Sequence, residues 1–267
     1  MKLISLNVAL FEANNHLLTK FLHEHKADFV CLQEITRSLE DGVDKAYVSK
    51  DVVDTTTKNL PYFFFGPNSI MGDFEQKNFH GKEIYRFEFG GLMEFGNYTK
   101  SHYKIVKAQN VFVQNSFTYS TDFSKWPDED YRAVLITDHI VQGKKIRILN
   151  YHGVWTRHKQ GNKMSLSANK IINELALKAE GEVIICGDFN LFPDTPSMNV
   201  FEKNFTSLVN VHNIRTTRPS TNELHASKRN VVDYILVSKG IRVKQFEVIE
   251  SNVSDHLPLV LDFELEK

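Results

Sequence analysis

The amino-acid sequence predicts a mixed α/β (α+β) domain with a substantial sheet core, and two observations lead to this class. Short apolar runs bounded by Gly, Pro or polar residues recur along the whole chain, as is typical of buried strands. Amphipathic segments interrupt these runs in both halves, as is typical of helices that pack on a sheet. The 267 residues are enough to bury a sizeable core, and no linker-like segment divides them. We therefore expect one domain over residues 1–267.

In the first half of the chain, apolar runs predict strands over 3–8, 28–34 and 62–65. Helices are predicted over 13–26 and 43–59. The first of these helices places four apolar side chains on one face: Leu17, Leu18, Phe21 and Leu22. Three consecutive threonines weaken the end of the second helix, because Thr is a poor helix former. The aromatic and Gly-containing residues 66–90 are expected to be irregular.

From residue 92 onward, predicted strands outnumber predicted helices. An amphipathic helix is predicted over 163–179 and a short helix over 196–202. The remaining apolar runs predict strands over 92–95, 103–113, 132–140, 146–151, 183–187, 231–237, 241–249 and 258–263.

Composition narrows the function classes. The formal net charge is −1, which argues against a protein that holds nucleic acid by bulk electrostatics but leaves room for a local basic patch. The two cysteines, Cys31 and Cys186, lie inside predicted buried strands and are expected to be reduced core thiols. No signal-like segment or membrane span is recognisable. We expect a cytoplasmic protein, monomeric by default, that does not bind membranes.

Polar side chains stand where several apolar runs end. Gly187-Asp188-Phe189-Asn190 follows one run, and Ser254-Asp255-His256 precedes another. Asn7, Glu34 and His152 occupy similar positions. Asp233 is embedded among hydrophobic neighbours and needs a partner, for which His256 is the obvious candidate, because an unpaired buried carboxylate is very costly. Such a set of groups, held rigidly at strand ends, suits a metal and a phosphate.

Six short motifs carry a family resemblance. SLNV, CLQEI, LNYHG, GDFN, VVDYILVS and SDHLPL occur in this order between residues 4 and 260. In these motifs the chain resembles the endonuclease/exonuclease/phosphatase superfamily, which includes pancreatic-type deoxyribonuclease, abasic-site endonucleases, neutral sphingomyelinases and inositol polyphosphate 5-phosphatases. The resemblance implies a deoxyribonuclease I-like, four-layer α/β/β/α sandwich of two mostly antiparallel sheets. The site would lie at one edge of it.

The resemblance also implies a Mg²⁺ cofactor, with Mn²⁺ as a possible substitute. Glu34 would be the main ligand and Asp255 the second carboxylate, bound directly or through water. Asn7 would bind the metal or orient its ligands.

The remaining motif residues would carry the reaction. Asp188 would orient and deprotonate the attacking water, and Asn190 would donate its amide hydrogens to a phosphoryl oxygen. Asp233 would fix the tautomer of His256, whose charged ring would face the phosphate. His152 would contact the phosphate and help to protonate the leaving oxygen, with Glu88 as its tentative partner.

Loops near these motifs mix basic and aromatic residues, which suits phosphate contacts and ring stacking. Trp155, Arg157 and Arg218 are the candidates for substrate binding, although ordinary solvated loop charge would have the same composition.

We therefore predict a Mg²⁺-dependent phosphoesterase that hydrolyses phosphodiester bonds by in-line attack of water, most readily a nuclease acting on DNA, RNA or nucleotides. One alternative is a phosphatase or phospholipase-type hydrolase of a small phosphorylated molecule or lipid head group. A more remote alternative is a catalytically inactive binding protein of the same fold. The near-zero net charge suits the phosphatase at least as well, whereas the motif carboxylates argue against the inactive protein.

Overall fold

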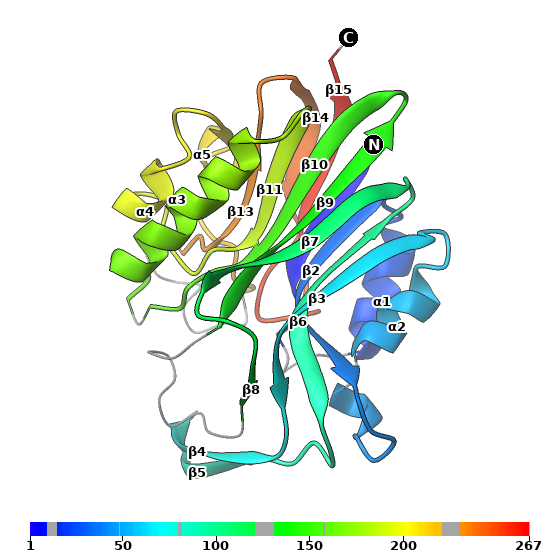
Figure 1. The fold of residues 1–267 in the computed structure, drawn as a ribbon, viewed down its shortest axis with the longest axis vertical. Coiled ribbons are helices and arrows are strands. Elements are labelled where there is room, and N and C mark those ends of the chain that lie inside the picture. Colours follow the sequence, from blue (N-terminus) through cyan, green and yellow to red (C-terminus); the bar gives the residue numbers. More distant parts are fainter. Residues whose placement is uncertain are drawn as a thin grey trace.

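Two β-sheets pack face to face, and helices cover their outer faces (Figure 1). The structure is a computed structural model that describes residues 1–9, 15–47, 49–79, 82–120, 131–156, 158–220 and 230–266. The predicted four-layer α/β/β/α sandwich is confirmed.

The first sheet has seven strands in the order β14-β15-β1-β2-β6-β3-β8. Its neighbours pair antiparallel except for two parallel pairs, β1 with β2 and β3 with β8. Its strands are β1 (Lys2–Asn7), β2 (Phe29–Ser38), β3 (Tyr62–Met71), β6 (Met93–Ser101), β8 (Thr118–Ser120), β14 (Ile241–Val248) and β15 (Leu259–Leu265).

The second sheet has six strands in the order β12-β13-β11-β10-β9-β7, with one parallel pair, β10 with β11. Its strands are β7 (Ile105–Gln114), β9 (Arg132–Val141), β10 (Lys144–His152), β11 (Glu182–Asp188), β12 (Thr206–Ser207) and β13 (Asp233–Val237). Because β1 and β2 run parallel, as do β10 and β11, the carboxyl ends of each pair meet at one edge of their sheet.

The helices form the outer layers. In Figure 1, α1 and α2 lie beside the first sheet, and α3, α4 and α5 lie beside the second. They are α1 (Asn15–Glu24), the 3-10 turn η1 (Lys45–Tyr47), α2 (Ser49–Thr56), α3 (Lys163–Leu177), α4 (Pro196–Asn199) and α5 (Leu208–Val211). Asn162 caps α3 by accepting from the Ser165 backbone N–H, which explains why this helix begins where it does. No helix among the described residues has the length and hydrophobicity of a membrane span.

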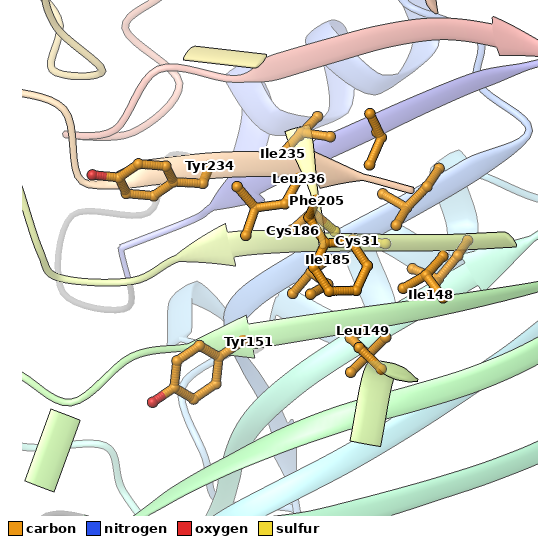
Figure 2. Packing of buried hydrophobic residues seen from close by; sticks show 14 of the residues in the cluster. Cys31, Ile148, Leu149, Tyr151, Ile185, Cys186, Phe205, Tyr234, Ile235 and Leu236 are labelled. Carbon is orange, nitrogen blue, oxygen red and sulfur yellow. The ribbon is translucent and has the colours of Figure 1, made fainter. Parts of the chain in front are cut away.

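The main core fills the space between the two sheets and continues beneath α3. Cys31 of β2 and Cys186 of β11 lie in this core with Ile185 and Leu236 (Figure 2). Both cysteines are free thiols and fully buried, as predicted, and burial raises the pKa of Cys31 well above its usual range.

One buried polar contact crosses this apolar layer. Gln33 Nε2 on β2 donates to Asn150 Oδ1 on β10 at 2.6 Å. Asn150 Nδ2 in turn donates to the carbonyl oxygens of Leu32 and Tyr98. The two amides are fully buried, so each needs the other to satisfy its polar groups. The hydrogen bond between these amides joins the two sheets. It lies close to the predicted site, because Gln33 precedes Glu34 and Asn150 stands two residues before His152.

The expectation of irregular structure over 66–90 is wrong. Strand β3 continues to Met71, and β4 (Phe74–Phe79) and β5 (Lys82–Phe87) form an antiparallel hairpin. Asp73 supports the base of this hairpin by accepting from the backbone N–H groups of Phe89 and Gly90. The alternation of polar and aromatic residues in this segment fits a two-stranded ribbon outside the core as well as it fits a loop. Pattern alone therefore did not separate the two structures.

Candidate active site

The strand ends at one edge of the sandwich bring the predicted polar residues together. On the second sheet, His152 pairs in register with Asp188, and Asp188 pairs with Asp233. On the first sheet, Asn7 ends β1, and Glu34 lies within β2. The loop between β14 and β15 adds Asp255 and His256. Ser254 fixes this loop, because its hydroxyl donates to the carbonyl oxygen of Asn7 at 2.7 Å.

Glu34 leaves the strand ladder at a bulge. The pairing of β2 with β6 shifts register between Leu32 and Ile35, and Glu34 adopts φ 59°, in the left-handed region. A non-glycine residue in this region is strained, and such strain concentrates at functional sites. At this bulge the Glu34 carboxylate, one-fifth exposed, lies 3.0 Å from Asn7 Nδ2 and 3.6 Å from His152 Nε2.

Asn7 holds two carboxylates together. Its Nδ2 donates to Glu34 Oε1 at 3.0 Å and to Asp188 Oδ2 at 3.1 Å, while its Oδ1 accepts from the Ala9 N–H at 2.9 Å. Each of the two sheets thus supplies one carboxylate oxygen that accepts from Asn7 Nδ2. Carboxylate oxygens are the donors that a hard divalent cation prefers, so the Glu34 carboxylate fits Mg²⁺, and Asp188 lies beside it.

Asp188 and Asn190 form a compact turn after β11. The Asn190 N–H donates to Asp188 Oδ1 at 2.8 Å, and Asn190 Nδ2 lies 3.2 Å from Asp188 Oδ2. Gly187 permits the turn, since its φ is 133° and a Cβ atom there would meet the Tyr151 carbonyl oxygen at 2.0 Å. Burial alone would raise the pKa of Asp188. The cationic or polar neighbours His256, His152, Arg218 and Lys159 outweigh it and lower that pKa, so Asp188 is a carboxylate at neutral pH.

His256 and Asp233 form the predicted pair. His256 Nδ1 lies 2.9 Å from Asp233 Oδ1 and 3.0 Å from Oδ2, and His256 Nε2 lies 3.6 Å from Asp188 Oδ2. Burial and Arg218 oppose a charge on the ring, but Asp233, Asp255 and Asp188 outweigh them and raise the pKa of His256 to about 9. Ligand atoms of Asp188, Asp233 and His256 lie within 4.8 Å of one another. Because the Asp233 contact already engages Nδ1, we interpret these groups as an ion pair beside Asp188 rather than as a metal cage.

The partner of His152 is Arg132, not Glu88. Arg132 Nη1 donates to His152 Nδ1 at 2.9 Å, whereas Glu88 is exposed in the loop before β6. A guanidinium always donates, so His152 carries its proton on Nε2, which lies 3.6 Å from Glu34 and 3.7 Å from Asp188. Burial and Arg132 lower the pKa of His152 well below its usual range.

Arg218 enters the site through Asp255. Its Nη1 donates to Asp255 Oδ2 at 2.5 Å and to the Asp255 carbonyl oxygen at 3.0 Å. Thr217 anchors this segment, because its hydroxyl oxygen accepts from the Val232 N–H and its carbonyl oxygen accepts from the Leu257 N–H. Because Arg218 is buried, its positive charge acts mainly on the groups of the site and is weakly screened by solvent.

The loop after β10 contributes Lys159, which was not among the residues predicted for the site. Trp155 is half-buried, and the Nζ atom of Lys159 lies 4.9 Å from the centroid of its ring. The same Nζ donates to Asn190 Oδ1 at 2.5 Å. Arg157, the other candidate in this loop, lies outside the described residues. Lys159 lies in the same loop as Trp155 and Arg157, but composition does not reveal which basic side chain of a loop turns inward.

The chain belongs to the Endonuclease/Exonuclease/phosphatase family, whose model matches residues 4–256. Members of this superfamily are hydrolases that act on phosphoesters. A comparison with curated proteins finds no match.

Solved structures show the same fold. An endonuclease/exonuclease/phosphatase from Beutenbergia cavernae aligns at a TM-score of 0.68 with 15% identity, covering 100% of this chain and 72% of the other. A mannosyl-6-phosphatase from Bacteroides thetaiotaomicron aligns at 0.64 with 15% identity, covering 99% and 100% of the two chains. The human Nocturnin catalytic domain with bound sulfate aligns at 0.62 with 17% identity, covering 99% and 94%.

Proposed function

We propose that this protein is a Mg²⁺-dependent phosphoesterase that hydrolyses a phosphodiester, of nucleic-acid or nucleotide type, by in-line attack of water. One observation carries the proposal: Asn7 holds the carboxylates of Glu34 and Asp188 together at the point where both sheets end. The ion pair of His256 and Asp233 faces the same point, since His256 Nε2 lies 3.6 Å from Asp188. The arrangement offers oxygen ligands for a cation, a base for water and a charged donor for a phosphoryl oxygen.

Glu34 would hold the metal, with Asp255 as a second carboxylate and Asn7 as the group that orients Glu34. Mn²⁺ would be accepted in place of Mg²⁺, because both prefer carboxylate, carbonyl and water oxygens. When bound, the cation would neutralise negative charge on the phosphoryl and leaving oxygens.

Protein side chains would carry out the proton transfer and bind the phosphoryl oxygens. Asp188 is ionised and close to two imidazoles, so it would orient the attacking water and accept its proton. Asn190 Nδ2 and the charged His256 ring would donate hydrogen bonds to phosphoryl oxygens as charge develops on them. His152 would act through its Nε2–H as a neutral donor, because Arg132 occupies the other ring nitrogen.

A second candidate substrate is a phosphomonoester. Three cationic side chains, Arg132, Lys159 and Arg218, each contact a different polar residue of the site. A monoester dianion carries one more negative charge than a diester, and this cation cluster suits it. The cluster also suits a diester that has a further phosphate nearby.

A panel of substrates in Mg²⁺, Mn²⁺ or EDTA tests the proposal. The panel contains single- and double-stranded DNA, RNA, bis-p-nitrophenyl phosphate, inositol phosphates and sugar phosphates. We expect metal-dependent cleavage of a diester that disappears in Asp188→Asn and persists in Asp262→Asn, an acid on β15 away from the strand ends. Activity on monoesters alone would select the second candidate. Diester cleavage that survives EDTA or the Asp188 substitution would refute the mechanism.

A further inference from the structure

Lys159 points into the site from a loop that is firmly held. The backbone of Lys159 has φ 55°, and its carbonyl oxygen accepts from the Phe192 N–H at 2.8 Å. The loop between β10 and α3 is thereby joined to the segment that follows Asn190. The ammonium is held at its other end by Asn190 Oδ1 and the face of Trp155. A lysine side chain fixed at both ends, with its charge turned away from water, has an entropic cost that an ordinary surface lysine does not bear.

Lys159 and Asp188 contact different atoms of the Asn190 amide. Asn190 presents Oδ1 to Lys159 at 2.5 Å and Nδ2 to Asp188 at 3.2 Å. In an in-line displacement the attacking and leaving oxygens lie on opposite sides of phosphorus. If Asn190 touches the phosphoryl group and Asp188 serves the attacking water, Lys159 is the cation at the other end of the same amide and is available to the leaving oxygen.

The surroundings of Lys159 suit proton donation near neutral pH. Burial and the charges of Arg218 and Arg132 lower the pKa of Lys159 to about 8, although Asp188 and Asp233 act in the opposite direction. The ammonium is therefore still protonated at pH 7 but gives up its proton far more readily than a lysine in water does. His152 is a poorer source of that proton, because its Nδ1 accepts from Arg132 and it holds only the Nε2 proton.

On the basis of the proposed function, we propose that Lys159 is the general acid of the reaction. The water oxygen forms a bond to phosphorus while Asp188 takes a proton from the water. The bond from phosphorus to the leaving oxygen breaks, its electron pair stays on that oxygen, and an Nζ–H of Lys159 supplies the proton that completes the alcohol. Lys159 becomes a neutral amine, Asp188 a carboxylic acid, and exchange with solvent restores both.

A pair of leaving groups tests this role in single-turnover reactions with Mg²⁺. p-Nitrophenolate leaves without help, whereas the sugar hydroxyl of a dinucleotide needs a proton. General acid catalysis contributes about 10²–10⁴-fold. Lys159→Met should therefore slow dinucleotide cleavage by about 10²-fold or more and bis-p-nitrophenyl phosphate cleavage by about threefold or less. Retained cleavage of the activated ester shows in the same experiment that the variant is folded.

The Lys159→Arg variant distinguishes proton donation by residue 159 from the effect of its positive charge alone. A guanidinium keeps the positive charge but does not lose a proton in proteins, so this variant should show the same selective loss as the methionine variant. Lys163→Met, a change at an exposed lysine in the first turn of α3, is the matched control and should leave both rates unchanged. Recovery of dinucleotide cleavage by arginine, or an equal loss on both substrates in Lys159→Met, would overturn the proposal in favour of a charge that only orients Asn190. If the wild type cleaves neither substrate, or Asp188→Asn cleaves both, the proposed function itself fails.

Discussion

Asp233→Asn is the most direct test of the charged His256 ring. The substitution keeps the shape of the side chain but removes the negative charge that lies 2.9 Å from His256 Nδ1. Asp233, Asp255 and Asp188 together raise the pKa of His256 from 6.5 to about 9 against the effect of burial. At about 1.4 kcal/mol per pKa unit, this shift corresponds to about 3 kcal/mol in favour of the imidazolium.

If Asp233 supplies most of that shift, His256 of the variant should titrate near the ordinary histidine pKa of 6.5. The variant should then lose about fourfold in kcat/KM at pH 7 and about 10²-fold at pH 8.5, and little at pH 5.5, where even an ordinary histidine is protonated. The assay is the pH profile of bis-p-nitrophenyl phosphate cleavage in Mg²⁺, with Asp262→Asn as the control. An independent measurement follows the ¹⁵N shifts of His256 in the metal-free protein, whose titration should move from near 9 to a lower pH. A loss that is the same at every pH, or no loss, would refute the assignment of a charged His256.

Three further outcomes are expected. Glu34→Gln should raise the Mg²⁺ concentration for half-maximal activity at least ~10-fold, because it removes the charge of the main ligand, and calorimetric Mg²⁺ titration should show the same weakening. Asn150→Ala should lower the free energy of unfolding by about 2–4 kcal/mol, since it removes from the core the Gln33 contact and two hydrogen bonds to backbone carbonyls; urea unfolding would measure this, and a change under ~0.5 kcal/mol would contradict the account. Burial lowers the pKa of His139 to about 4, so the unfolded chain binds a proton that the native state does not. Stability should therefore fall as the pH drops from about 6.5 to 4, by up to about 3 kcal/mol, and His139→Gln should flatten this pH dependence.

Much of the sheet architecture could be predicted from the sequence because each buried strand has a strong local signal. The run over 183–187 corresponds to β11, and the helix over 163–179 corresponds to α3. The β4–β5 hairpin has no such signal. Phe74 of this hairpin lies in a small cluster separate from the main core, and the alternation of its residues fits a loop as well as a strand.

The candidate site could be predicted only in part. Asp188 and Asp233 stand at the ends of recognisable strands, where strand pairing brings them together, and His256 lies in the loop just before β15. The contacts of Arg132 and Lys159 arise from side chains that reach across the site from other segments. Which groups these two side chains contact depends on their rotamers and on the paths of the loops, and the spacing of residues in the sequence does not determine either. Glu88 illustrates the limit, since the family resemblance suggested a carboxylate partner for His152, with Glu88 as the tentative position, where the fold supplies a guanidinium.

The position of β1 bears on how this protein is made. β1 carries Asn7 and lies between β2 and β15, so one of its two neighbours is synthesised early and the other among the last residues of this sequence. The Ser254 hydroxyl that holds Asn7 in place also comes late. Because non-local strand pairing is slow compared with local folding, the first sheet stays incomplete during most of translation. A nascent chain on the ribosome would thus carry Asn7, Glu34 and Asp188 before the Ser254 contact and the β15 pairing that hold Asn7 in place, and we expect the site to be complete only after translation has passed β15.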